Sequence, residues 1–136
     1  MTETAPDDLT PAATMAVAAL TGDPVARVAG DADLASIARA LVEGEVGALI
    51  VGDDERPAGI ISERDLVRAL AGGDAPATTA AQLAHTELIW CDAASTVADV
   101  AEQMMDHYVR HILVEEDGRL VGIVSARDLL GVYASS

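Results

Sequence analysis

Nearly the same eight residues occur twice in this chain. The stretch "GIISERDL" runs from Gly59 to Leu66, and "GIVSARDL" runs from Gly122 to Leu129, 63 positions later. When the sequence is shifted by 63 positions, the similarity continues without a gap and aligns residues 14–70 with residues 77–133. Because repeats adopt the same local structure in each copy, the chain must build one supersecondary unit twice.

The spacing of apolar residues predicts a helix early in each copy. Between Leu34 and Val42 the apolar residues recur at intervals of three and four, as they do on the buried face of an α-helix. Asp31 and Asp33 are the candidate N-caps of this helix, and Gly44 marks its end.

The other segments of each copy alternate between short apolar runs and polar turns. In the first copy we expect a helix near 11–21, strands at 23–28, 46–51 and 58–61, a turn at 52–57 and a helix at 62–70. In the second copy we expect helices at 78–85, 97–107 and 126–133 and strands at 88–91, 109–114 and 120–124. The predicted order in each copy is therefore α-β-α-β-β-α.

The length of the chain indicates how the two copies combine into a fold. With 136 residues it suits one domain, or two small halves that share a core. One copy alone is too small to cover both faces of its sheet. We therefore predict an α/β (α+β) fold in which two tandem motifs pack sheet to sheet with pseudo-twofold symmetry. The expected parts are a flexible tail at 1–11, a first motif at 12–70, a linker at 71–77 and a second motif at 78–136.

Composition excludes several classes of function. The net charge is −15, and all eight basic residues are Arg, so the surface repels nucleic-acid phosphates and we expect no binding of DNA or RNA. The absence of Lys excludes a Walker lysine and Schiff-base chemistry. No apolar run approaches the roughly 20 residues of a membrane span, and Cys91 is the single cysteine. We expect a cytoplasmic protein with no membrane association.

The repeated motif has a purely structural interpretation. Ser62 and Asp65, like Ser125 and Asp128, follow a predicted strand at the S-x-x-D spacing of a capping box. In this interpretation the serine caps the first turn of a helix, and the acidic residue reaches back to the backbone of the serine. No ligand is required.

A ligand-binding interpretation is compatible with the capping. A helix N-terminus is an anion site, and an aspartate one turn into the helix accepts hydrogen bonds from a ribose diol. Arg64 and Arg127, one residue before each aspartate, are within reach of a phosphate. Gly59 and Gly122 leave room for close approach to the backbone. We expect both aspartates to be exposed at their helix starts.

The sequence resembles the CBS-domain pair, or Bateman module, over residues 12–133. The resemblance is carried by "GIISERDL" and "GIVSARDL" and by the preceding segments "VGALIVGDDERPAGI" and "VRHILVEEDGRLVGI". It implies that Asp65 and Asp128 bind the ribose of an adenosine ligand, with Ser62, Ser125, Arg64 and Arg127 near the ribose or phosphate. It also implies a basic contribution from Arg110 and His111, where the first copy has Gly47 and Ala48 instead.

This resemblance leads to a functional hypothesis. It implies a stand-alone regulatory module, not an enzyme, which binds AMP, ATP or S-adenosylmethionine in clefts between the motifs and signals through an effector protein of unknown identity. The alternative is a ligand-free structural module whose helices mediate oligomerisation. A small enzyme lacks support, because no His neighbours either serine in the sequence and no G-x-S-x-G motif occurs.

Two further sets of residues need an interpretation. His85, His107, His111 and Cys91 suggest a zinc site, but a strand is predicted to begin between His107 and His111, so we expect no metal. The final helix of each copy carries more apolar residues than its own sheet requires. We expect a homodimer whose flat face contains Leu66, Leu70, Leu129 and Val132.

Overall fold

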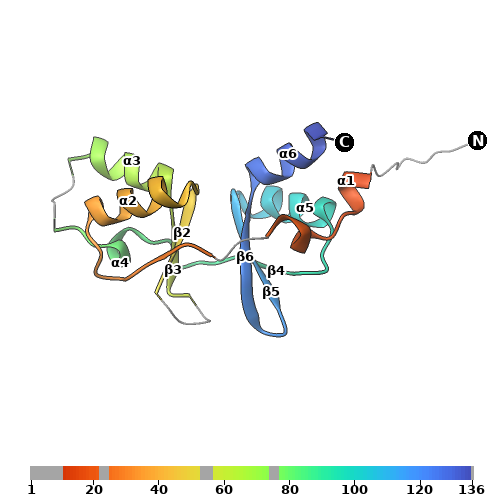
Figure 1. The fold of residues 1–136 in the computed structure, drawn as a ribbon, viewed down its shortest axis with the longest axis horizontal. Helices are drawn as coiled ribbons and strands as arrows, with labels where there is room; N and C mark the ends of the chain where they lie inside the picture. The colour runs from red at the N-terminus through yellow and green to blue at the C-terminus, as the bar shows by residue number, and fades with distance from the viewer. Residues whose placement is uncertain (1–10, 22–24, 53–56, 74–76, 136) are drawn as a thin grey trace, which may run out of the picture. The chain divides into compact units, whose positions relative to one another are not determined.

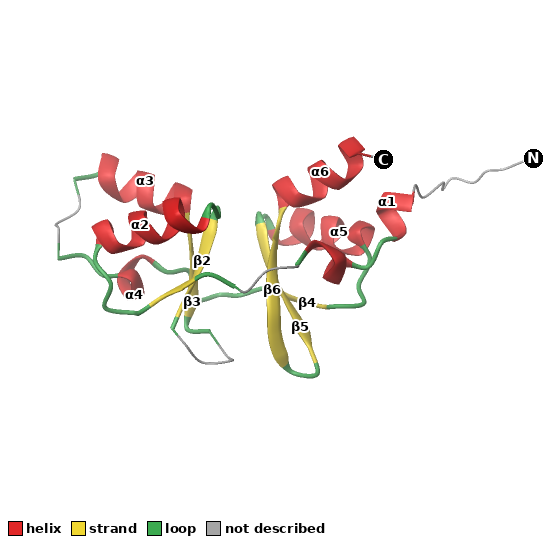
Figure 2. Cartoon of the chain, viewed as in Figure 1, coloured by secondary structure: helices red, strands yellow, loops and turns green. Residues whose placement is uncertain are grey.

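The computed structural model describes residues 11–21, 25–52, 57–73 and 77–135. Its chain divides into two compact units (Figures 1 and 2). The central unit consists of residues 25–88, and the terminal unit combines the described residues up to 21 with those from Ile89 onward. The predicted N-terminal tail lies outside the described residues, except for its last residue, Pro11.

The central unit is built on a three-stranded sheet of order β1-β2-β3. Its elements are β1 (Arg27–Val28), α2 (Leu34–Gly44), β2 (Ala48–Val51), β3 (Gly59–Ser62), α3 (Glu63–Ala71) and α4 (Ala80–Leu83). Strand β1 pairs in parallel with β2, and β2 pairs antiparallel with β3. Helices α2 and α3 lie side by side (Figure 1).

The terminal unit repeats this plan. Its elements are α1 (Pro11–Thr14), η1 (Val17–Leu20), β4 (Trp90–Asp92), α5 (Val97–His107), β5 (His111–Glu116), β6 (Arg119–Ser125) and α6 (Ala126–Ser135). Strand β4 pairs in parallel with β5, and β5 pairs antiparallel with β6. The mixed α/β class with two three-stranded sheets is therefore confirmed, while the packing of sheet on sheet stays a prediction.

Local sequence explains where the helices begin. Asp33 caps α2 by accepting a hydrogen bond from Ser36 N–H at 2.8 Å, as the sequence predicted for one of its two candidates. Helix α5 covers 97–107, as expected, and is capped by Thr96. Helices α2 and α5 are each followed by a residue with left-handed backbone, Glu45 (φ 52°) after α2 and Tyr108 (φ 55°) after α5. Helix α2 ends at Gly44, as the sequence pattern predicts.

Each sheet has its own apolar core. Ile37, Leu49 and Ile61 are fully buried in the central unit, and Val100, Ile112 and Val124 are fully buried in the terminal unit. These residues come from the periodic positions of the helices and from the inward face of the strands. No described residue with a polar or charged side chain is fully buried. None of the described helices is long and apolar enough to cross a membrane.

The first helix of each copy contacts the sheet of the other copy. Val17 N–H donates to Ser95 O at 2.7 Å, which joins η1 to the segment before α5. Correspondingly, Ala80 N–H donates to Ala32 O at 2.8 Å, which joins α4 to the segment before α2. The structural units therefore do not follow the halves of the sequence repeat.

These contacts also shorten two expected helices. The helix expected near 11–21 is divided into α1 and η1, because the 93–95 segment accepts hydrogen bonds from Val17 N–H and Ala18 N–H. The helix expected at 78–85 ends at Leu83, because His85 instead pairs with Ile60 beside β3.

Candidate functional site: the two serine–aspartate helix starts

Each copy of the repeated motif forms the junction between a strand and a helix. In the central unit Ser62 ends β3 and caps α3, while Asp65 lies at the third position of the helix. Asp65 N–H donates to Ser62 Oγ at 3.2 Å, and Ser62 N–H donates to Asp65 Oδ2 at 2.8 Å. This reciprocal pair is the capping box that the spacing predicted.

The terminal unit has the same reciprocal pair. Asp128 N–H donates to Ser125 Oγ at 3.0 Å, and Ser125 N–H donates to Asp128 Oδ2 at 2.8 Å. The two helix starts also share a contact to the neighbouring strand segment. Glu63 N–H donates to Gly47 O and Ala126 N–H donates to Arg110 O, each at 2.8 Å. Two amides of each first turn are thus already used by the protein.

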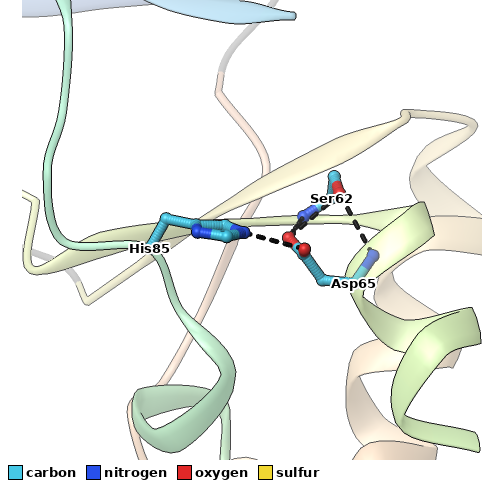
Figure 3. A network of polar contacts seen from close by, with 3 residues as sticks. All are labelled: Ser62, Asp65 and His85. Carbon is cyan, nitrogen blue, oxygen red and sulfur yellow. Dashed lines mark hydrogen bonds and ion pairs between the residues drawn. The ribbon is translucent and has the colours of Figure 1, made fainter. Parts of the chain in front are cut away.

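The two aspartates differ in what else they contact. Asp65 Oδ1 lies 2.8 Å from His85 Nε2, and Asp65 Oδ2 also accepts from the Ser62 hydroxyl at 3.0 Å (Figure 3). The side chain of Asp65 is only 10% exposed, whereas that of His85 is 60% exposed. Asp128 is exposed, and Ser125 is its one side-chain hydrogen-bond partner among the described residues. The expectation that both carboxylates are exposed is therefore wrong for Asp65.

The contacts of Asp65 control its protonation. Burial raises the pKa of this carboxyl, but the hydrogen bonds from Ser62 N–H and from His85 outweigh burial, so the pKa lies below its usual value. Asp65 is therefore ionised at neutral pH. An ionised carboxylate only accepts hydrogen bonds, so His85 donates its Nε2–H to Asp65.

Most of the basic residues expected near the ligand lie in the terminal unit. His111 is the first residue of β5 and pairs directly with Ser125 at the end of β6. Arg110 precedes β5 and accepts the Ala126 N–H, and Arg127 follows on the first turn of α6. Both arginines are exposed and His111 is half-buried. Two arginines and a histidine therefore lie on the first turn of α6 and on the strand segment that pairs with its start.

The central unit has fewer cations at the corresponding place. Gly47 and Ala48 take the positions of Arg110 and His111, and Ala48 pairs with Ser62. Arg64 is exposed on the first turn of α3, beside Glu63. The asymmetry expected from the sequence is thus present in the structure.

The repeated fold, the paired helix starts and the strand pairing agree with comparisons to known proteins. The family model of the CBS domain matches residues 17–72 and again residues 80–135. The chain belongs to the CBS-domain family. It carries two CBS domains, and each contains one of the helix starts described above.

Relatives of this CBS-domain pair span most of its length. Hypoxic response protein 1 of Mycobacterium tuberculosis is 38% identical over 99 residues, which are 71% of this chain and 69% of that protein. A CBS-domain-containing protein from Agrobacterium tumefaciens has a similar crystal structure, with a TM-score of 0.78, 33% identity and coverage of 88% of this chain and 99% of that chain. A CBS domain protein from Pyrobaculum aerophilum, solved in complex with AMP, has a TM-score of 0.76 and 27% identity, covering 90% of this chain and 100% of that one.

The role of His85 in this CBS-domain pair does not follow from the sequence, in which His85 is only a candidate zinc ligand together with His107, His111 and Cys91. Among the described residues, no group of three or more His, Cys, Asp and Glu side chains is placed to hold a metal ion. The repeat offered no sign of the contact, because the 63-residue shift aligns His85 with Gly22.

The glycines of the motif also have a different role from the one expected. A Cβ at Gly59 would lie 2.7 Å from Ala84 Cβ and 2.8 Å from His85 O, and a Cβ at Gly122 would lie 2.5 Å from Thr21 Cβ. All three distances are shorter than the contacts that Cβ atoms make in folded proteins. The room at these glycines is therefore used by the protein's own backbone and side chains rather than being open to a ligand.

The residues expected to form a dimer face divide into two groups. Leu66 and Leu129 are each only 6% exposed and pack in the cores of their own units, so their assignment to an exposed face is wrong. Leu70 is exposed, and Val132 is half-buried. The outward positions of these helices are Val67 and Leu70 on α3 and the repeat-equivalent Leu130 and Tyr133 on α6.

Proposed function

We propose that this CBS-domain pair is a regulatory module that binds an adenosine-containing nucleotide and transmits the bound state to an effector protein, without catalysing a reaction. The observation that carries the proposal is the helix start at Asp128. There an exposed carboxylate lies one turn from Ser125, in a first turn that also carries Arg127, with Arg110 and His111 on the adjoining strand segment.

The chemistry of this helix start matches a nucleoside monophosphate. Ribose hydroxyls donate hydrogen bonds, and an exposed carboxylate accepts them. Arginines bind phosphate oxygens by charge-assisted hydrogen bonds. The binding of AMP by the Pyrobaculum aerophilum relative supports an adenosyl ligand here as well. Ser62, Arg64 and Asp65 are the corresponding ligand-binding residues proposed in the central unit.

The local charge favours a ligand with few phosphates. At physiological ionic strength the screening length is about 8 Å, so the cations near the helix start matter more than the net charge of −15. Two arginines suit a monophosphate, or the carboxylate of S-adenosylmethionine, better than a triphosphate without Mg²⁺. We expect AMP to bind at least as tightly as ATP without Mg²⁺, and GMP to bind more weakly.

Calorimetric titration with AMP, ADP, ATP, S-adenosylmethionine and GMP tests this proposal. Asp128→Ala is expected to weaken AMP binding by about 1.5–3 kcal/mol, the range for a hydrogen bond to a charged group. Asp106→Ala removes an equivalent charge from the exposed surface of α5 and is the matched control. Equal AMP affinity in wild type, Asp128→Ala and Asp65→Ala would show that the motif only caps the helices. An affinity that rises steadily with the number of phosphates would contradict the proposed class of ligand.

The second candidate function is oligomerisation without a ligand. It is favoured by the repeat-equivalent apolar residues exposed on the helices, Val67 and Leu70 on α3 and Leu130 and Tyr133 on α6. A second copy of the chain is the proposed partner, because a duplicated surface suits a symmetric homodimer. The two functions are distinguished by thermal unfolding: a nucleotide sensor gains stability as AMP is added, and a purely structural module does not.

A further inference from the structure

His85 contacts the carboxylate of Asp65, which the proposed function assigns to ribose binding. We infer that His85 is an intramolecular competitor for this ribose: it occupies Asp65 in the ligand-free protein and must move away before a nucleotide binds there. The two CBS domains then differ, with the Asp128 site open and the Asp65 site closed. This inference rests on the proposed function and specifies how its two sites are regulated.

The first support is the set of hydrogen bonds at Asp65. Oδ2 accepts from both the N–H and the hydroxyl of Ser62, and Oδ1 accepts from His85 Nε2 at 2.8 Å. Because Asp65 only accepts when ionised, His85 offers it a donor, as a ribose hydroxyl does. The imidazole therefore makes the same kind of hydrogen bond that the sugar would make, on the oxygen that Ser62 leaves open.

The second support is the burial of the two partners. Asp65 is 10% exposed and His85 is 60% exposed. A ligand approaching Asp65 therefore has little of the carboxylate available while the contact holds. His85, by contrast, is surrounded largely by solvent, and exposed ion pairs are weak. Its side chain can rotate away while its backbone stays paired with Ile60.

The third support is the comparison with the other CBS domain. Its aspartate, Asp128, is exposed and has no histidine contact among the described residues. The residue aligned with His85 by the repeat is Gly22, which has no side chain to place on a carboxylate. The competitor is therefore present in one copy of the duplication only.

Calorimetric titration of AMP into an Asp128→Asn background, in which the second site is disabled, tests the inference. His85→Ala is expected to tighten the remaining site by about two- to fivefold, the size of an exposed ion pair. His85→Gln keeps a neutral donor to Asp65 and is expected to retain the wild-type affinity. His107→Ala, which removes an exposed histidine of the other unit, is expected to change nothing.

The outcomes separate this inference from the proposed function. Binding that is unchanged or weakened by His85→Ala would overturn the inference alone, since His85 would then be neutral or a contact of the ligand. Binding of AMP that appears only after His85→Ala would support it. Absence of nucleotide binding to the wild type and to every variant would remove the proposed function and this inference together.

Discussion

Ile60 and His85 exchange both of their backbone hydrogen bonds: Ile60 N–H donates to His85 O at 3.1 Å, and His85 N–H donates to Ile60 O at 3.0 Å. This pair ties a segment of the second sequence copy to the last strand of the first sheet. It also holds the imidazole of His85 beside Asp65. One backbone pairing thus contributes to both the fold of the central unit and the state of its candidate site.

The close approach at this pairing predicts the effect of Gly59→Ala. The new Cβ would lie 2.8 Å from His85 O, which is backbone and cannot simply rotate away. We expect a loss of about 1–3 kcal/mol in the free energy of unfolding, as for other overpacked sites. Urea denaturation followed by circular dichroism measures it. Gly131→Ala is the control, because an added Cβ there meets no atom within 4 Å and alanine favours a helix interior. Equal stability of Gly59→Ala and wild type would contradict the packing.

The lowered pKa of Asp65 predicts how the fold responds to acid. Such a carboxyl stabilises the fold when the pH is above the pKa that it has in the unfolded chain, about 4. This stabilisation is lost as the pH falls through the lower pKa that it has in the folded protein. Asp65→Asn is therefore expected to be less stable than wild type at pH 6 and to lose less stability between pH 5 and pH 2. Urea denaturation across this pH range measures how the free energy of unfolding of each protein depends on pH. The control Asp106→Asn, on the exposed surface of α5, should show the same pH dependence of stability as wild type.

The buried thiol of Cys91 is expected to be unreactive in the folded protein. Burial, with smaller contributions from Asp92 and Glu115, raises the pKa of Cys91 to about 11. Since the thiolate is the reactive form, a disulfide reagent at pH 8 should react slowly with native protein and rapidly in urea. By linkage, the unfolded thiol ionises first, so stability should fall as the pH rises from about 8.5 toward the folded value. Rapid stoichiometric labelling of the native protein would contradict this.

The exposed apolar residues of α6 predict the effect of substitution on assembly. If the homodimer forms through the helices, Leu130→Asp with Tyr133→Asp should shift the light-scattering mass from dimer to monomer, because two charges would be desolvated in an apolar interface. Met15→Asp replaces another exposed apolar residue, outside α6, and is the control. A monomeric wild type at micromolar concentration would contradict the homodimer itself.

Much of this protein was determined by its sequence alone. The duplication is visible in the sequence itself. The order of strands and helices, the α5 bounds and the capping boxes of Ser62 and Ser125 follow from short-range patterns. Such patterns are informative because capping, helix periodicity and strand alternation involve residues close together in the chain. The resemblance to the CBS-domain pair rested on the same local motifs, and the family comparison confirmed it.

Only the tertiary structure decided which segments meet. The exchange of α4 and η1 between the two copies, the contact of His85 with Asp65 and the burial of Leu66 and Leu129 depend on pairings between distant residues. The repeat pattern treats Asp65 and Asp128 as equivalent, because their neighbours in the chain are nearly identical. They differ because an aspartate's burial and pKa are set by what packs against it, and here a histidine 20 residues away covers one carboxylate while the other stays exposed.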